Sequence, residues 1–480
     1  MSCLAAVVCE DGSSERIRKM LCAMVTRGIK AYGIATPEEI ETPLKLGDHF
    51  SAKDSTIAIG HGIGEDALES AAQPLRKLGT NVSIAGRVFP RPAPDDAQNL
   101  LKWMTEIEEP ADFIKCNVGA YAFAVLRDKH LSIGRDSSGG APLYVGQVRD
   151  GVALATERKA LWAIGATTTR PFAPGSVTTF FDRKTKTTKV PIPCAKLPKG
   201  EEIPQLLEAL RKAVGRRLSD VNRVALAFSG GVDSSIVAKL AVESVKVELV
   251  HVVFGGESKE LAQARQAARA LGLDLWEDSV SPEECEDAIP DVLWAIETHD
   301  AQALEIALAI HFVAKGVRDM GCRVVMMGQG ADELFAGYSR YQRTYSSRGE
   351  PAVLDEMSRD IAEMHEKNLA RDEKVCARSG VEIRSPFWDV QVISLANSIP
   401  IDLKLSDPQD PLRKKILRDL ASRLGLPETI SKSPKKAIQY GSGSHRLLKE
   451  IALRSGKSLT EYAESRFEEV KKKELSSPIC

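Results

Sequence analysis

Cysteine is scarce in this chain, with nine residues in 480. That number is too small for a disulfide framework. No Cys-x-x-Cys pair is present, so a structural zinc site has no sequence support. Both features are typical of a protein in a reducing compartment, and we expect a cytoplasmic location.

Long apolar runs are also missing. The opening run, Leu4–Val8, is short and no basic segment precedes it, so it does not predict a secretory signal. The most apolar later stretch, residues 303–314, contains Glu305 and His311. It falls short of the roughly 18 residues that a membrane-spanning helix needs. We therefore expect no membrane contact.

Neither sign of charge is in excess. Lys and Arg number 65 and Asp and Glu number 66, which gives a net charge of −1. This balance argues against a general polyanion binder, so we expect no nucleic-acid partner. The 35 glycines and 24 prolines are ordinary usage and exclude a low-complexity chain. What is present is a globular composition, long enough at roughly 150 residues per domain for two large domains or about three smaller ones.

Two segments of different character follow one another. Residues 1–190 are rich in short apolar runs separated by Gly, Pro and Asp, which predicts strands. Residues 184–200, rich in Lys, Thr and Pro, resemble a linker. Residues 200–480 begin with alternating strands and helices, the pattern of a doubly wound parallel sheet. Beyond about residue 290 we expect mostly helix, with one further strand. The elements expected in this second domain are a helix at 203–218, a strand at 224–228, a helix at 236–242, a strand at 247–254, a helix at 261–271 and a strand at 323–327.

The sharpest motif follows the strand at 224–228. It reads Ser229-Gly230-Gly231-Val232-Asp233-Ser234-Ser235. A strand, a Gly-rich turn and a helix place several N–H groups at a helix N-terminus, where they favour phosphate. The three serine hydroxyls add donors, and Asp233 beside phosphate implies a cation such as Mg²⁺. The spacing is not that of the common P-loop. A tight turn with a helix cap is the alternative, and the strand before the turn counts against it.

This segment resembles the SGGxDS signature of ATP pyrophosphatases, which split ATP into AMP and pyrophosphate while adenylating a substrate. NAD and GMP synthetases, tRNA-modifying thiolases and asparagine synthetases share that signature. Three later blocks resemble those of asparagine synthetases and occur in the same order: residues 324–338, residues 368–389 and residues 434–441. A tRNA thiolase is the least expected, because neither a Cys pair nor a basic tract accompanies the motif.

The resemblance implies roles for individual residues. Phe228, Phe254, Met327 and Gly328 match positions that seat the adenosine, and residues 229–235 would hold the phosphates. Asp233 and Asp332 would bind Mg²⁺. Lys435 matches a lysine that stabilises negative charge on the adenylating intermediate. The residues expected to shape the aspartate pocket are Glu382, Arg384 and Asp389, although Arg384 and Asp389 could instead belong to an ion-pair network that supports the helices.

Gln329 departs from the family pattern. Asparagine synthetases often carry Glu at this position, and β-lactam synthetases carry Tyr. Because Gln cannot act as a base, deprotonation of ammonia would need another group. The missing Tyr disfavours a β-lactam product. We keep Gln329 among the candidate catalytic residues, together with Lys435 and Glu382.

The first domain resembles class II glutamine amidotransferases. The resemblance implies an N-terminal-nucleophile (Ntn) type αββα sandwich, in which two sheets lie between helices. The segments that carry it are Arg27-Gly28 with Tyr32-Gly33, residues 59–62, 119–128, 134–144, 155–161 and 174–177.

The active-site positions of that family are altered here. Its nucleophile is an N-terminal Cys whose own α-amine is the general base. Removal of Met1 would expose Ser2 and leave Cys3 inside a peptide bond; only loss of Ser2 as well would restore Cys3, while Ser2 could itself act as the nucleophile. The oxyanion-hole Asn-Gly reads Ala85-Gly86, and losing such a donor costs about 10²–10³ in rate. The glutamine-binding Arg is also replaced, around residues 62–64. These changes favour a retained fold without efficient glutaminase activity.

The sequence leaves three functional hypotheses. The first is an ATP-dependent carbon–nitrogen ligase that adenylates aspartate and amidates it with ammonia, free or glutamine-derived, to give asparagine, AMP and pyrophosphate. The second is a related amide-forming ligase for another carboxylate. The third is a non-catalytic homologue that binds nucleotide. All three take small molecules, with ATP and Mg²⁺ as cofactors in the first two, and the resemblance also suggests a homodimer.

Overall fold

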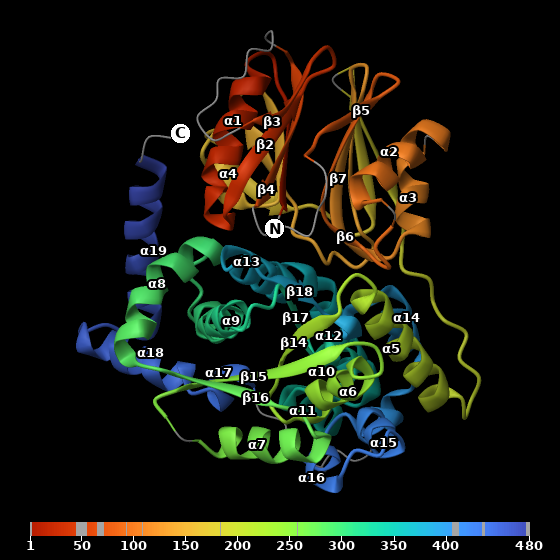
Figure 1. The fold of residues 1–480 in the computed structure, drawn as a ribbon, viewed down its shortest axis with the longest axis vertical. Helices are drawn as coiled ribbons and strands as arrows, with labels where there is room; N and C mark the ends of the chain where they lie inside the picture. Colours follow the sequence, from red (N-terminus) through yellow and green to blue (C-terminus); the bar gives the residue numbers. More distant parts are fainter. Residues whose placement is uncertain are drawn as a thin grey trace. The chain divides into compact units, whose positions relative to one another are not determined.

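The computed structural model divides the chain into two compact units (Figure 1). One unit contains residues 1–192, 377–380 and 469–480, and the other contains residues 193–376 and 381–468. Among the described helices, none is long and apolar enough to cross a membrane. The residues that the structure describes are 2–44, 55–64, 72–92, 94–107, 109–182, 184–256, 258–405, 412–433 and 437–476.

Two antiparallel sheets form the first unit. The seven-stranded sheet has the order β11 (Thr168–Pro171), β9 (Tyr144–Val148), β10 (Gly151–Ala155), β1 (Ser2–Val8), β4 (Ile57–Gly64), β2 (Ile29–Ala35) and β3 (Ile40–Leu44). The six-stranded sheet has the order β13 (Lys184–Lys189), β12 (Ser176–Phe181), β8 (His130–Arg135), β7 (Gly119–Arg127), β6 (Thr80–Val88) and β5 (Leu75–Lys77).

Helices cover the outer face of each sheet in this unit (Figure 1). The seven-stranded sheet carries α1 (Ser13–Ala23) and α4 (Arg158–Trp162), and the six-stranded sheet carries α2 (Asp96–Glu106) and α3 (Pro110–Cys116). Successive residues of a strand point to opposite faces. Accordingly Cys3 of β1 packs in the core beneath α1, whereas Leu4 packs in the core between the sheets. The expected αββα sandwich is confirmed.

A five-stranded parallel sheet organises the second unit. Its order is β16 (Leu275–Val280), β15 (Lys246–Phe254), β14 (Arg223–Ala227), β17 (Val324–Met326) and β18 (Glu382–Arg384). The chain starts at β14, moves outward through β15 and β16, and returns to the other side of β14 with β17. The order therefore reverses between β14 and β17, and ligands of such sheets bind beyond the strand ends at that point.

Helices flank this sheet on both sides. Figure 1 shows α7 (Lys259–Leu271) on one side of β15 and β16 and α9 (Ala301–Asp319) on the other. The connections on the first side include α6 (Val232–Ala241), which follows β14, and α5 (Glu202–Leu218) leads into the sheet. The expected doubly wound parallel sheet with a helical C-terminal part is confirmed.

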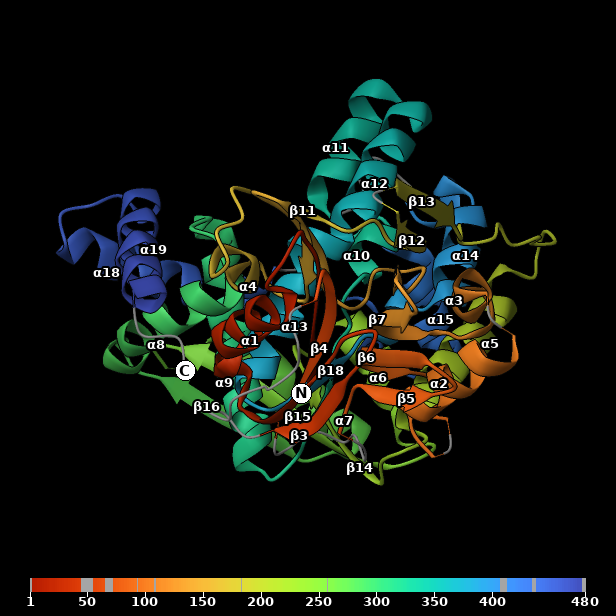
Figure 2. The same ribbon diagram turned by 90° about the horizontal axis from the view of Figure 1, so that it is seen from above.

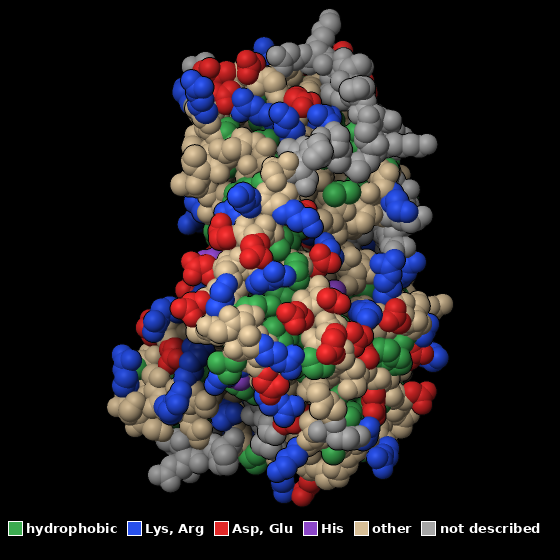
Figure 3. Space-filling model, turned by 90° about the vertical axis from the view of Figure 1, so that its left-hand side faces the viewer, with side chains coloured by type: hydrophobic (Ala, Val, Ile, Leu, Met, Phe, Trp, Pro, Cys, Tyr) green, Lys and Arg blue, Asp and Glu red, His purple; other side chains and the backbone are tan. Residues whose placement is uncertain are grey.

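The later helices include a hairpin and several shorter elements. Helices α11 (Ser339–Arg348) and α12 (Glu350–Met364) lie side by side (Figure 2). They follow the short helix α10 (Ala331–Leu334), and α15 (Lys415–Arg423) packs against α6. On the face drawn in Figure 3, basic and acidic side chains are interspersed, as the balanced composition leads one to expect.

Three strands differ from the sequence-based expectation. The first residues of the expected linker form β13, which pairs with β12. This edge strand is exposed along nearly its whole length, and its alternating Lys and Thr suit a solvated edge. The strand β16 was not expected, and β18 is a second strand beyond residue 290 where only one was expected. Charged residues at both ends of β18 hide it in the sequence, because its pairing with β17, not its own composition, makes it a strand.

Candidate nucleotide and metal site

The Gly-rich turn connects β14 to α6. Gly230 has a φ of +69°, and a Cβ there would lie 2.9 Å from the carbonyl oxygen of Gln263, so only glycine fits. The N–H of Gly231 donates to Ser229 Oγ over 3.3 Å. The turn thus presents the N-terminus of α6 at the carboxyl edge of the sheet, where a phosphate would meet several N–H donors.

The three motif serines lie together at this turn. Ser234 Oγ is 3.4 Å from Ser229 Oγ and donates to the carbonyl of Gly231 over 3.3 Å. Ser235 is fully buried, and its hydroxyl finds no hydrogen-bond partner among the residues that the structure describes. The expected clustering of hydroxyls at one helix N-terminus is therefore present in the geometry, and their contact with phosphate stays a prediction.

Asp233 and Asp332 converge although they are far apart in sequence. Asp233 is in the first turn of α6, after β14, and Asp332 is in α10, after β17. Because β14 and β17 are neighbours in the sheet, both carboxylates reach the same edge. The two loops touch, since a Cβ on Gly328 would lie 3.0 Å from Cβ of Asp233.

Lys414 joins the two carboxylates, and the sequence analysis missed it. Its Nζ lies 2.5 Å from Asp233 Oδ2 and 2.7 Å from Asp332 Oδ1, and its side chain is only 1% exposed. Two carboxylates at one place repel each other unless a cation lies between them. Lys414 belongs to a run of basic residues, Arg413-Lys414-Lys415, and nothing local distinguishes the buried lysine from its neighbours.

Gly337 leaves the room that this arrangement needs. A Cβ at this position would lie 1.9 Å from Asp332 Oδ1 and 2.2 Å from Cε of Lys414. Its N–H also donates to the backbone carbonyl of Asp332 over 2.8 Å, and Arg413 Nε donates to its carbonyl over 2.7 Å. The glycine is therefore part of the wall of the carboxylate site.

Glu333, next to Asp332, faces a different set of partners. It is 3% exposed, and burial raises its pKa above the usual range, with the charge of Asp332 adding to the rise. Tyr338 donates its hydroxyl to Glu333 Oε1 over 2.7 Å, and the Asn368 amide donates over 3.0 Å. These two donors hold the side chain of Glu333 and so fix the helix that carries Asp332.

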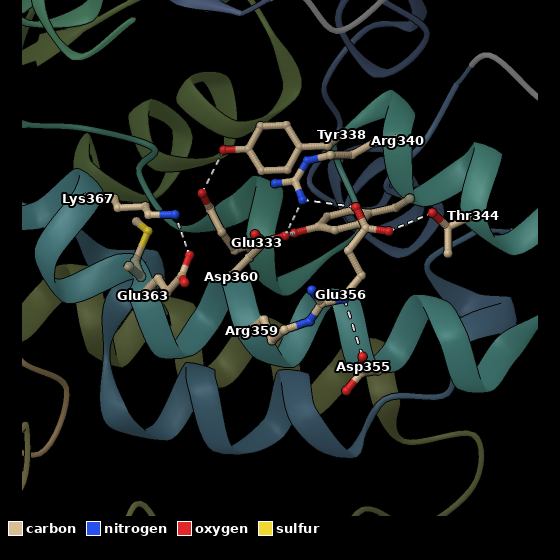
Figure 4. A network of polar contacts seen from close by, with 12 residues as sticks. Glu333, Tyr338, Arg340, Thr344, Asp355, Glu356, Arg359, Asp360, Glu363 and Lys367 are labelled. Atoms are coloured by element: carbon tan, nitrogen blue, oxygen red, sulfur yellow. Dashed lines mark hydrogen bonds and ion pairs between the residues drawn. The ribbon is translucent and has the colours of Figure 1, made fainter. Parts of the chain in front are cut away.

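A polar network continues from Tyr338 into the α11–α12 hairpin (Figure 4). Arg340 Nη1 lies 3.0 Å from a carboxylate oxygen of Glu356 and 2.6 Å from one of Asp360, and its guanidinium stacks over the ring of Tyr338. Thr344 donates to Glu356 over 2.6 Å. The hairpin is thereby tied to the segment that carries Glu333.

The four residues expected at the adenosine lie on neighbouring strand ends. Phe228, Phe254 and Met327 follow or end β14, β15 and β17 and are all buried, and Gly328 follows Met327. The main chain of Phe228 is engaged, since its N–H donates to Val250 and its carbonyl lies 2.7 Å from His251 Nδ1. The sheet brings this set to one edge, beside the Gly-rich turn. Nucleotide contact stays a prediction.

Arg384 and Asp389 belong to a buried ion-pair network. The Arg384 guanidinium contacts Asp220 at 2.6 and 3.0 Å and Glu382 at 2.7 Å. Asp389 contacts Arg217 at 2.6 Å. Arg384 and Asp389 are each 1% exposed. Arg384 and Asp389 therefore make the contacts of an ion-pair network. The Glu382 carboxylate belongs to the same network.

The remaining two candidates are Gln329 and Lys435. Gln329 is half-buried in the turn between β17 and α10, beside Gly330, where a Cβ would lie 2.7 Å from the ring of Trp388. Lys435 lies outside the described residues.

In the first unit, the register of β1 decides which residue occupies the nucleophile position. Ser2 Oγ accepts a hydrogen bond of 3.2 Å from the N–H of Gly86 on the opposite sheet. Cys3 is fully buried in the core beneath α1, and burial raises the pKa of its thiol to about 12. Shortening the chain to Cys3 would not change the face to which the thiol points.

The position of the expected oxyanion hole is also altered. Ala85 is buried and offers no side-chain donor. Gly86 has a φ of +99°, and a Cβ there would lie 2.1 Å from the carbonyl oxygen of Ala120. The backbone N–H of Gly86 is thus kept, while the side-chain donor expected at residue 85 is lost.

Comparison with known proteins gives matches to both units. The asparagine synthase family model matches residues 205–355 and 345–476, and a glutamine amidotransferase domain model matches residues 68–163. Putative asparagine synthetase (glutamine-hydrolyzing) 1 of Methanocaldococcus jannaschii is 33% identical over 391 residues, which cover 70% of this chain and 72% of the relative. Asparagine synthetase (glutamine-hydrolyzing) 2 of Arabidopsis thaliana is 28% identical over 358 residues, which cover 70% of this chain and 61% of that protein.

Among solved structures, glutamine phosphoribosylpyrophosphate amidotransferase from B. subtilis is 14% identical, with a TM-score of 0.37. The match covers 59% of this chain and 91% of that one.

The wall formed by Gly337 can be tested with Gly337→Ala. The added methyl group would collide with Asp332 Oδ1 and Lys414 Cε, so we expect the free energy of unfolding to fall by about 1–3 kcal/mol, measured by urea denaturation. Gly215→Ala is the matched control, because nothing lies within 4 Å of its Cβ and alanine in the helix α5 should stabilise by roughly 0.5–1 kcal/mol. Equal stability of the two variants would contradict the packing described.

Arg384→Met tests the buried network. It leaves Glu382 and Asp220 without their shared cation, and we expect a loss of about 3–5 kcal/mol in the free energy of unfolding. The control is Arg211→Met, which removes an exposed pair with Glu243 and should cost no more than about 1 kcal/mol. A small loss for Arg384→Met would show that the network does not hold the edge strand.

The orientation of Cys3 predicts a chemically inert thiol. A buried thiol with a raised pKa carries almost no thiolate at pH 8, so iodoacetamide should label the exposed Cys116 and Cys194 long before Cys3 in the folded protein. Peptide mass spectrometry after timed labelling would measure this. If Cys3 is labelled as fast as Cys116, its thiol does not face the buried core beneath α1.

Proposed function

The chain belongs to the asparagine synthase family, whose members are ATP-dependent carbon–nitrogen ligases, and from this premise we propose that it makes asparagine from aspartate, ATP and ammonia. The products are AMP and pyrophosphate. The observation that carries the proposal is the convergence of Asp233 and Asp332 beside the Gly-rich turn. N–H groups that can donate to phosphate and a pair of carboxylates lie at the same edge of the sheet. This arrangement suits the cleavage of a nucleoside triphosphate.

The carboxylate pair fits Mg²⁺. Asp233 Oδ1 is buried and finds no hydrogen-bond partner in the described part of the chain, and hard oxygen ligands are what this ion prefers. Among the described residues no group of three or more His, Cys, Asp or Glu side chains could hold a metal, so substrate phosphates and water would complete the coordination. When bound, Mg²⁺ would neutralise phosphate charge.

The chain's own residues would position the reacting groups. The N–H groups of residues 229–235 would bind the phosphates, and the buried strand ends at Phe228, Phe254 and Met327 would exclude water from the adenosine. An aspartate carboxylate oxygen would then attack the α-phosphorus, forming a P–O bond as the bond to pyrophosphate breaks. Lys435 is proposed to stabilise the charge that develops.

Amide formation is the second step. Ammonia would attack the acyl carbon, the bond to AMP would break, and a proton would leave the nitrogen. Gln329 cannot take that proton, so we propose that Gln329 positions substrate by hydrogen bonding and that Glu382 contributes to the acyl pocket. The same residue keeps an alternative open, in which a carboxylate other than aspartate is adenylated with the same release of pyrophosphate.

We further propose that free ammonia, and not glutamine, is the efficient nitrogen source. Residues 1–190 would then be an amidotransferase-like domain that keeps its fold, and residues 200–480 the synthetase domain. The buried position of Cys3 and the missing side-chain donor at Ala85 support free ammonia as the nitrogen source. The proposal extends to a cytoplasmic homodimer without a nucleic-acid partner, as the family resemblance suggests.

The test is pyrophosphate release by the purified full chain with MgATP and aspartate, supplied with ammonium or with glutamine, alongside amino-acid analysis. We expect asparagine from ammonium and little from glutamine. Asp332→Asn should lower the rate roughly 10²-fold or more, because charge stabilisation at the phosphates is lost. Asp319→Asn, an exposed aspartate at the end of α9, is the matched control and should retain the wild-type rate.

Each arm has a contrary result. Absence of aspartate-dependent pyrophosphate would reject aspartate as the substrate. Asparagine formed as fast from glutamine as from ammonium would reject the nitrogen source proposed here and require an active nucleophile in the first unit.

A further inference from the structure

Lys414 occupies the position between Asp233 and Asp332 where a metal ion would have to bind. Its Nζ is within 2.7 Å of an oxygen from each carboxylate. An ammonium carries one positive charge and the pair carries two negative ones, and the charge of Arg413 also acts on Asp332. Among the described residues, the buried Oδ1 of Asp233 has no hydrogen-bond partner, so this oxygen remains available to a metal ion.

Exposure differs between the cation and its partners. The Lys414 side chain is 1% exposed, whereas Asp233 and Asp332 keep 15% and 17% of theirs. The ammonium thus lies deeper than the carboxylates, which retain an edge that an incoming ligand can reach. A metal ion arriving from that edge would meet oxygen atoms already engaged by the lysine.

The backbone holds Lys414 in place. Its φ is +64°, unusual for a residue with a Cβ, and its carbonyl accepts from the N–H groups of Leu417 and Arg418 at the start of α15. The stem passes Gly337, where any Cβ would lie 2.2 Å from Cε of the lysine. With the main chain and stem fixed, the ammonium can leave the carboxylates only by rotating about the last side-chain bonds.

We propose that Lys414 is an exchangeable counterion: it neutralises Asp233 and Asp332 in the nucleotide-free protein, and a divalent metal displaces it. A metal ion bound to the same oxygens and an ammonium at hydrogen-bond distance from both would repel each other at close range. Once displaced, the ammonium is free to pair with the phosphates that accompany the metal. This inference rests on the proposed metal site, but it concerns the order of events at that site and not the carboxylate that is amidated.

The first test measures Mn²⁺ affinity of the nucleotide-free full chain by calorimetry. Lys414→Met removes the competing charge, and we expect Mn²⁺ to bind roughly 10- to 100-fold more tightly than to wild type, the usual range for two linked equilibria. Lys415→Met, which removes an exposed pair with Asp419, is the matched control and should bind Mn²⁺ like wild type. Unchanged or weaker binding by Lys414→Met would overturn the proposal.

Loss of the lysine also removes the cation between the two carboxylates, so stability is a second readout. We expect Lys414→Met and Lys414→Gln to unfold at lower temperature than wild type and to regain stability in Mn²⁺ to a greater extent than wild type does. Variants that are destabilised and gain no more from Mn²⁺ than wild type would show that Lys414 is only a structural ion-pair partner.

A third test uses the wild-type chain. Reductive methylation followed by peptide mass spectrometry should leave Lys414 unmodified without metal and modify it when Mn²⁺ is present, while Lys415, 40% exposed, reacts in both. Protection of Lys414 that Mn²⁺ does not change would overturn the displacement.

These three readouts need neither aspartate nor ammonia. Failure to form asparagine together with metal-dependent release of Lys414 would therefore reject the proposed substrate and keep the exchange. Asparagine formation without metal-dependent release of Lys414 would reject the exchange and keep aspartate as the substrate.

Discussion

The ion pairs from Lys414 to Asp233 and Asp332 connect three segments that meet only in the folded chain. Two carboxylates are brought to one edge because β14 and β17 are neighbours in a parallel sheet, and they would repel each other without a cation between them. The lysine reaches them past Gly337, where no side chain can be accommodated. This contact links the Gly-rich turn, α10 and the start of α15 at one place.

Buried polar groups outside the carboxylate site stabilise the elements that carry it. Glu333 is bound by Tyr338 and Asn368, which fixes the helix that carries Asp332. At the far edge of the sheet, β18 pairs with β17, and Arg384 of β18 also pairs with Asp220, in the segment between α5 and β14. The charges of Glu333 and Arg384 are each held by donors or opposite charges, so the elements beside the site are rigidly supported, as a site with demanding geometry requires.

The first unit has a well-packed sandwich but altered residues at the active-site positions of the amidotransferase fold. Its two sheets and flanking helices persist with a packed core, while Cys3 faces the helical layer and Ser2 faces Gly86. Because side chains alternate along a strand, a single residue of offset at the start of β1 is sufficient to exchange the groups on the two faces. A sandwich can therefore be kept while residues at its active-site positions change, since packing depends on the pattern of apolar residues and catalysis on one or two atoms.

The sequence by itself determined the local elements: the strand, Gly-rich turn and helix around residues 229–235, the alternation of strands and helices, and the two-part organisation. These follow from short-range steric and hydrophobic patterns that are complete within a few residues. It did not reveal the strands β13, β16 and β18 or the role of Lys414, and it left open whether Arg384 belongs to an ion-pair network. Those features depend on pairing between distant segments, and a lysine in a basic run becomes a buried counterion only when folding brings residues 233 and 332 beside it. Tertiary structure alone decided which charges met, because charge pairing is set by distance in space and not by position in the chain.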